Sequence, residues 1–247
     1  MSAPLFFTGQ GRLSTVAVDD RFVLDGPEGR HAADVSRLGP GETVLLADGS
    51  GLLARSEVVE RRKGELELRV QEVVSVAEPD PRFTLVQALA KGDRDLLAIE
   101  VGTELGVDDV VPWQADRSIV RWRGERAAKA HRKWEQTVLA ATKQARRARV
   151  PGVAPLADRQ AVIQRIAAAD LALVLHEEAT EPLAGVDLPG AGEVLLVVGP
   201  EGGISPEETQ AFVDAGARTV RLGSTVLRTS TAGSAAIALL SARARWR

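Results

Sequence analysis

The stretch that decides the fold reads Leu195-Leu196-Val197-Val198-Gly199-Pro200-Glu201-Gly202-Gly203-Ile204-Ser205-Pro206-Glu207-Glu208. Its uninterrupted apolar start is typical of a buried strand in a parallel sheet. Helix-start signals follow, because Ser205 is placed as an N-cap, Pro206 suits the first helical position and Glu208 completes a capping box. The three glycines between them let a ligand approach the backbone closely. The stretch therefore predicts a strand, a turn and a helix, and the turn is either a plain tight connection or a ligand site.

The same alternation of strands and helices extends in both directions from this stretch. We expect strands at residues 83–90, 110–113, 171–175, 194–198 and 219–222. We expect helices at residues 93–105, 125–147, 206–215 and 229–245, and another that begins after Asp158 as its cap. This pattern predicts an α/β domain with a parallel sheet.

The first part of the chain follows a different pattern, in which short β-like runs alternate with turns. The runs lie at residues 21–24, 43–47, 52–59 and 66–74, and Asp48-Gly49-Ser50-Gly51 suits a tight hairpin between the second and the third. Glu78-Pro79-Asp80-Pro81 then interrupts regular structure, because each proline removes a donor and restricts the residue before it. We therefore expect a small β-rich domain at residues 1–77 and an α/β domain at residues 82–247.

Composition excludes several classes of chemistry. The 247 residues include no cysteine, so disulfides and thiolate catalysis are excluded, and the three histidines, His31, His131 and His176, are scattered, so we expect no metal site. No apolar run approaches the roughly 20 residues that span a bilayer, and the opening residues lack the pattern of a signal peptide. We expect a cytoplasmic protein without a membrane segment.

The net charge of −3 hides a strongly basic segment. Residues 117–149 hold eleven Lys or Arg and only two acids, Glu125 and Glu135. This is either a solvated helix face, with arginines near the C-terminus of the helix dipole, or a surface that tracks phosphates, with Trp113, Trp122 and Trp134 divided between the core and base stacking. We favour the second interpretation. The candidate RNA contacts of the segment are Arg117, Arg121, Arg123, Lys143, Arg146 and Arg147.

A second polar turn joins a predicted strand to a predicted helix. It reads Leu222-Gly223-Ser224-Thr225-Val226-Leu227-Arg228-Thr229-Ser230-Thr231-Ala232. Neither turn has the spacing of a dinucleotide fingerprint or a phosphate-binding loop. Two neighbouring strand ends would then face one ligand that is neither a dinucleotide nor a nucleotide held by a phosphate-binding loop.

These residues together resemble one family, the RsmE-type 16S rRNA uridine-N3 methyltransferases of the knotted SPOUT superfamily. The resemblance spans nearly the whole chain. It is carried by residues 199–203 and 222–232, and also by residues 91–94, 104–107, 143–151 and 175–180. It implies a C-terminal SPOUT trefoil-knotted methyltransferase domain and an N-terminal β-rich PUA-like barrel that binds RNA. In the barrel, Asp34-Val35-Ser36-Arg37 departs from the family's Arg-Val-Leu-Arg, and only Arg37 carries over as an RNA contact.

The resemblance also implies S-adenosyl-L-methionine as the cofactor, held in a bent form by three loops. The implied cofactor-binding residues are Leu175, His176, Gly199, Pro200, Glu201, Gly202, Gly203, Leu222, Gly223, Val226 and Leu227. We expect Gly202 to need a positive φ. The family forms homodimers, and the small residues 231–236 suit either a dimer interface or packing within the domain.

Methyl transfer to uridine N3 is a direct displacement, so the enzyme chiefly aligns the reacting atoms and needs no metal. The imide proton must leave, and a cation beside the base oxygens would stabilise the developing charge. Arg228 is the candidate, with a salt bridge or helix-start contact as the alternative. Ser230 stands where many relatives have Glu, and we assign no general base.

We therefore expect S-adenosylmethionine-dependent methylation of uridine N3 in 16S rRNA of the small ribosomal subunit. The alternatives are methylation at another RNA position, such as a ribose 2′-hydroxyl, and a non-catalytic RNA-binding factor for ribosome assembly.

Overall fold

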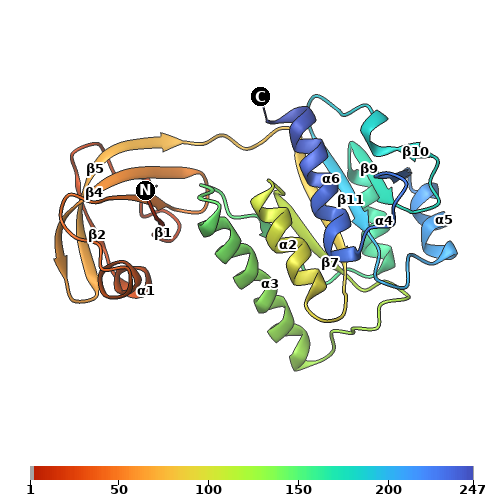
Figure 1. Ribbon diagram of the computed structural model, residues 1–247, viewed down its shortest axis with the longest axis horizontal. Helices are drawn as coiled ribbons and strands as arrows, with labels where there is room; N and C mark the ends of the chain where they lie inside the picture. Colours follow the sequence, from red (N-terminus) through yellow and green to blue (C-terminus); the bar gives the residue numbers. More distant parts are fainter. Residues whose placement is uncertain (1–2, 247) are drawn as a thin grey trace. The chain divides into compact units, whose positions relative to one another are not determined.

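The computed structural model describes residues 3–246, which form two compact units (Figure 1). The first unit comprises Met1–Glu78 together with Thr142–Val150, and the second comprises Pro79–Ala141 together with Pro151–Arg247. No helix in the described range is both long and apolar enough to cross a membrane.

The second unit is built on a seven-stranded parallel sheet in the order β10-β12-β9-β11-β6-β7-β8. The strands are β6 (Arg82–Ala88), β7 (Asp109–Trp113), β8 (Gly152–Val153), β9 (Leu171–Leu175), β10 (Glu181–Pro182), β11 (Glu193–Val198) and β12 (Arg218–Arg221). The helices are α2 (Arg94–Glu104), α3 (Glu125–Gln144), α4 (Arg159–Ala168), α5 (Pro206–Asp214) and α6 (Thr229–Ala244), with a short 3₁₀ turn at Leu183–Gly185. This architecture confirms the predicted α/β class; the two-residue strands β8 and β10 were not predicted.

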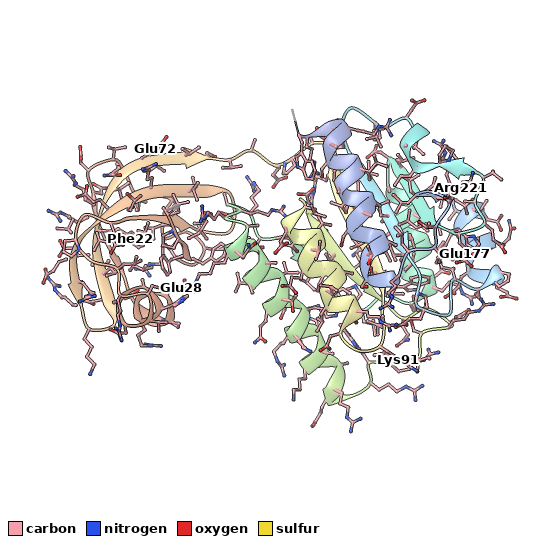
Figure 2. All side chains as sticks on the ribbon, in the orientation of Figure 1. Phe22, Glu28, Glu72, Lys91, Glu177 and Arg221 are labelled. Atoms are coloured by element: carbon pink, nitrogen blue, oxygen red, sulfur yellow. The ribbon has the colours of Figure 1, made fainter. Side chains whose placement is uncertain are left out.

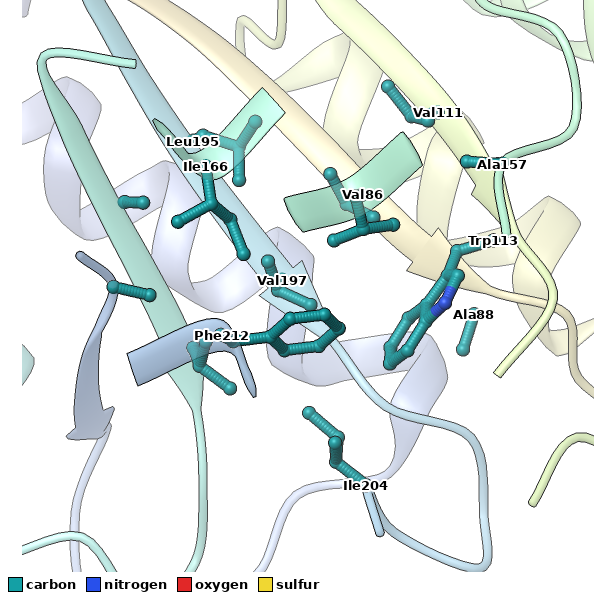
Figure 3. Close-up of a cluster of buried hydrophobic side chains, with 14 of the residues drawn as sticks. Val86, Ala88, Val111, Trp113, Ala157, Ile166, Leu195, Val197, Ile204 and Phe212 are labelled. Atoms are coloured by element: carbon teal, nitrogen blue, oxygen red, sulfur yellow. The ribbon is translucent and has the colours of Figure 1, made fainter. Parts of the chain in front are cut away.

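Helices cover both faces of this sheet. On one face, α4 and α5 pack on alternate residues of the central strands, where Phe212 of α5 meets Trp113 of β7 edge-on at 5.4 Å between ring centroids (Figure 3). On the other face, α2 and α6 pack against each other and against β6. The small residues of α6 allow this close contact, since a Cβ on Gly233 would lie 3.0 Å from Leu85 Cδ1 and Ser234 Oγ donates to the Ala98 carbonyl at 3.3 Å. Gly233 and Ser234 therefore pack within their own domain.

The first unit is a five-stranded sheet in the order β1-β3-β4-β5-β2. Its strands are β1 (Leu5–Phe7), β2 (Arg21–Leu24), β3 (Thr43–Ala47), β4 (Leu52–Arg62) and β5 (Glu65–Ser75). The predicted hairpin joins β3 to β4, and Gly49 and Gly51 take positive φ angles of 82° and 116° there. The sequence did not predict β1, the helix α1 (Gly26–Arg30) or the π-helical turn His31–Val35 that follows α1.

The end of α3 differs from the prediction. The helix ends at Gln144 instead of Arg147, because Arg146 adopts a left-handed φ of 54°. Residues 142–150 belong to the first unit: Lys143 Nζ binds Glu28 Oε2 at 2.6 Å, and Arg149 Nε donates to the Val76 carbonyl at 3.1 Å. The predicted domains, residues 1–77 and 82–247, did not assign residues 142–150 to the N-terminal unit.

The packing around Phe212 predicts a large cost for its removal. We expect Phe212→Ala to lower the free energy of unfolding by about 3–5 kcal/mol, because a fully buried ring leaves a cavity against Trp113. Urea unfolding measures this, and Val213→Ala on the same helix, where the side chain is exposed, is the control. Equal losses for the two variants would contradict the assigned core.

Candidate functional site

A pocket of about 870 Å³ opens at the carboxyl edge of the parallel sheet. The loops that follow β9, β11 and β12 line it, together with Arg94 and Arg117. Glu177 and Arg221, which are labelled in Figure 2, belong to its exposed lining. All eleven predicted cofactor-binding residues line this pocket, and so does Arg228.

The sheet order brings the three loops together. Strand β9 pairs in parallel with both β11 and β12, so the carboxyl ends of these strands lie side by side. Helix α6 follows β12 but packs on β6 and β11. Residues 222–228 must therefore cross the carboxyl ends of β9 and β11 to reach the start of α6.

The glycine turn after β11 is shaped by close backbone contacts. The Gly203 amide donates to the Pro200 carbonyl at 2.9 Å, and Gly203 has a φ of +72°. A Cβ on Gly199 would lie 2.7 Å from Ile204 Cγ1. Gly202 does not have a positive φ, so that expectation was wrong: the left-handed position is the next residue, where the turn closes.

The predicted capping box fixes the end of this turn. Ser205 Oγ accepts from the Glu208 amide at 3.1 Å, and Glu208 Oε2 accepts from the Ser205 amide at the same distance. Buried Glu208 also accepts from the Asp116 amide at 2.8 Å. Arg117, the next residue, donates to the Gly202 carbonyl at 3.1 Å. The segment after β7 is thus tied to the glycine turn at two points.

Glu201 ties the same turn to the connection between β6 and α2. Its Oε1 accepts hydrogen bonds from the Lys91 amide and from Arg94 Nη1, both at 3.0 Å. Partial burial raises the pKa of the Glu201 carboxyl, but hydrogen bonds from the Glu201 and Lys91 amides and from Arg94 outweigh it, so the pKa lies below its ordinary value. The carboxylate form therefore holds this side of the pocket.

A buried polar contact that the sequence analysis missed holds the third side. Thr229 Oγ1 donates to the Gly199 carbonyl at 2.7 Å and accepts from Gln87 Nε2 at 2.8 Å. Gln87 is fully buried in β6, among apolar neighbours. The side-chain amide of Gln87, inside the apolar run 83–90, was the signal that could have revealed this contact, because buried polar groups need partners.

The loops after β9 and β12 supply the remaining lining. The His176 amide donates to the Val220 carbonyl at 2.9 Å, and His176 Nδ1 accepts from the Glu178 amide at 3.2 Å. Leu175, Leu222 and Leu227 offer half-buried apolar surface. Val226 is 74% exposed beside them.

Arg228 lies at the pocket with an exposed side chain. Its carbonyl accepts from the amides of Thr231 and Ala232, at 2.8 and 2.9 Å, and so begins α6. Within residues 3–246 no hydrogen bond or ion pair of its guanidinium group is recorded, so the salt-bridge alternative has no support there. The cation is available to a ligand in the pocket.

The other predicted RNA contacts, Arg37, Arg121, Arg123, Lys143, Arg146 and Arg147, lie outside the pocket lining. Arg37 is exposed in the first unit, and Arg121 donates to the Asp116 carbonyl at 3.1 Å. Trp113 and Trp134 are buried in the core, which excludes them from base stacking. Trp122 is half-buried, edge-on to Trp134 at 5.6 Å.

The lining fits a nucleoside-containing cofactor. The volume falls within the roughly 300–1,000 Å³ of small-molecule sites. The missing Cβ at Gly203 leaves room for close approach of a ligand, whereas Gly199 and Gly202 make room for Ile204 and Arg117, and the leucines can cover an aromatic base. In the described part of the chain, no group of three His, Cys, Asp or Glu side chains could hold a metal ion.

Comparisons with known proteins match both parts of the chain. The family model of the RNA methyltransferase domain matches residues 78–241, and that of the RNA methyltransferase PUA domain matches residues 24–71. Ribosomal RNA small subunit methyltransferase E of Mycobacterium bovis is 47% identical over 229 residues, which cover 91% of this chain and 87% of the relative. The protein of the same name from Bacillus subtilis is 29% identical over 89% of both chains. The Neisseria gonorrhoeae protein of that name, crystallised with S-adenosyl methionine, has a TM-score of 0.84 at 27% identity over 98% of both chains.

The Glu201 contacts predict an acid-sensitive stabilisation of the turn. A folded-state pKa below the ordinary value of 4.5 gives stability that is present above 4.5 and is lost as the pH falls through the folded pKa. We expect Glu201→Gln to lower the melting temperature at neutral pH, and the difference from wild type to vanish in acid. A difference that is independent of pH would contradict this role of the carboxylate.

The geometry of Gly203 predicts the loss of ligand binding on substitution. We expect Gly203→Val to abolish binding of S-adenosylmethionine in calorimetry, because a branched side chain resists the φ of +72° and enters the pocket. Gly216→Val is the matched control, since Gly216 has a φ of +105° but does not line the pocket. Normal binding by a folded Gly203→Val protein would mean that the site is misplaced.

Proposed function

The chain belongs to the ribosomal RNA small subunit methyltransferase E family, and from that premise we propose that it methylates N3 of a uridine in 16S rRNA of the small ribosomal subunit. The observation that carries the proposal is the single pocket formed by the loops after β9, β11 and β12. S-adenosyl-L-methionine is the cofactor, as in the solved relative from Neisseria gonorrhoeae.

The loops hold the cofactor in this proposal. S-adenosylmethionine supplies a methyl group on a sulfonium, which makes the sulfur a good leaving group. The Gly199–Gly203 turn and the loop 222–227 hold the cofactor through backbone contacts and cover its base with leucine side chains. Alignment of nucleophile and methyl group is the main contribution of such a site. The contacts of Glu201 with Arg94, and of Thr229 with the Gly199 carbonyl, keep the turn in the required shape.

Arg228 completes the site as the candidate catalytic residue. Uridine N3 becomes nucleophilic when its proton leaves, and the negative charge then spreads to the neighbouring base oxygens. A guanidinium group beside these oxygens stabilises that charge. Arg228 suits this role because it lies at the pocket and its guanidinium group has no recorded partner within residues 3–246.

We further propose a homodimer that acts in the cytoplasm, where small subunits assemble. The support for the dimer is an apolar side chain, Val226, that is 74% exposed beside the pocket. A second copy of the chain could cover it. Sedimentation of the purified protein measures this, and a monomer at all concentrations would remove this part of the proposal.

The modified nucleoside tests the proposed reaction. In cells that lack the gene we expect 16S rRNA without the 3-methyluridine found in the parent strain, by mass spectrometry of its nucleosides. Loss of a ribose-methylated nucleoside instead would favour the other RNA position. Unchanged nucleosides together with a subunit-assembly defect would favour a non-catalytic assembly factor.

Substitution of Arg228 separates catalysis from cofactor binding. We expect Arg228→Ala to lower kcat by about 10²–10³-fold, as for the loss of one donor to a developing anion. Affinity for S-adenosylmethionine should stay near wild type, and Arg228→Lys should restore part of the rate because it keeps the charge. A normal kcat in Arg228→Ala would show that this cation does not assist the reaction.

A further inference from the structure

The basic segment 117–149 contains cations of two kinds. Several are engaged within the chain: Arg117 with the Gly202 carbonyl, Arg121 with the Asp116 carbonyl, Lys133 with Asp93, Lys143 with Glu28 and Arg149 with the Val76 carbonyl. Others are exposed, and no hydrogen bond or ion pair of their side chains is recorded in the described chain: Arg123, Arg126, Lys129 and Arg132. We call these four residues the α3 basic stripe.

Helix geometry places Arg126, Lys129 and Arg132 of the stripe on the outer side of α3, and Arg123 precedes the helix. Trp134 and Val138 are buried and define the inner side of the helix. At about 100° per residue, Lys129 and Arg132 point away from that side, and Arg126 flanks them. Glu135, one of the two acids of the segment, contacts His131 at 3.5 Å. The outer face of this part of α3 is therefore predominantly basic.

Contacts within the protein do not explain the stripe. Helix α3 begins at Glu125, so Arg126 stands in its first turn, where the helix dipole disfavours a cation. Lys129 follows in the second turn. Their spacing of three residues adds repulsion between like charges. The alternative of arginines that stabilise the C-terminus of the helix does not apply to them. An external polyanion would offset both costs.

The residues of this face favour a nucleic acid over a lipid surface as the polyanion. A helix that binds a lipid surface needs an exposed apolar side, but α3 has one exposed large apolar side chain, Leu139 at 44%, whereas Trp134 and Val138 are buried in the protein. Regularly spaced cations match the repeating charges of a nucleic-acid backbone. The stripe is also continuous in sequence with Arg117, which lines the pocket, and Figure 1 shows α3 starting from the loop that follows β7.

We propose that the α3 basic stripe binds the phosphate backbone of the RNA whose uridine enters the pocket. This inference rests on the proposed function and adds the surface that carries the substrate. It assigns backbone contacts to Arg126, Lys129 and Arg132, and Arg123 lies in the sequence between these residues and Arg117 of the pocket lining.

Salt dependence of RNA binding tests the stripe. A labelled uridine-containing RNA hairpin would be titrated with wild type and with the triple variant Arg126→Gln, Lys129→Gln, Arg132→Gln over a range of salt concentrations. Each phosphate contact contributes roughly 0.7–0.9 to the slope of log affinity against log salt, so the loss of three contacts should reduce the slope by about 2–3. Its melting temperature should not fall, because glutamine suits a helix and removes the repulsion.

Matched single variants and the cofactor separate the possible outcomes. Lys129→Gln should lose nearly one unit of slope, whereas Arg165→Gln, which removes one cation from α4, should leave the slope unchanged. An unchanged slope in the triple variant would overturn the role of the stripe while leaving the proposed reaction intact. Failure of wild type to bind either S-adenosylmethionine or RNA would instead overturn the proposed function itself.

Discussion

The parallel pairing of β9 with both β11 and β12 is the constraint on which the rest of the site depends. Because all three strands run in the same direction, their carboxyl ends meet at one edge, and three loops distant in sequence become the walls of one pocket. Helix α6 packs on β6 and β11, so the segment from β12 to α6 crosses the carboxyl ends of β9 and β11. A register change in β9 would displace two of the three loops at once.

Hydrogen bonds fix the conformation of the glycine turn in this pocket. The glycine turn alone has little to hold it, since glycine is the most flexible residue. Glu201, Thr229 and Glu208 anchor it to three different parts of the domain, namely the loop after β6, the start of α6 and the segment after β7. Several polar groups of this turn therefore have a fixed partner, namely the Glu201 carboxylate and the carbonyls of Gly199 and Gly202, whereas the Arg228 guanidinium group remains available. This contrast distinguishes the groups that position the turn from the cation that we propose to stabilise the developing charge.

Much of this could be predicted from local sequence. The capping box at Ser205, the hairpin at Gly49 and the main strands and helices follow from short-range rules, and the structure agrees with them. Long-range contacts were not predictable in this way. The bond of Gln87 to Thr229 joins residues 142 positions apart, and the left-handed Arg146 that ends α3 belongs to a segment packed on the first unit. The eleven cofactor residues were assigned by resemblance to a family, and the sheet order explains why they share one pocket.

The central feature of the proposed enzyme is one cofactor site formed by three loops. Hydrogen–deuterium exchange with and without S-adenosylmethionine measures this directly, because bound backbone amides exchange more slowly. We expect protection in all three loops, at residues 175–180, 199–204 and 222–228, at the same cofactor concentration. Protection confined to another region, or to only one of these loops, would contradict this expectation.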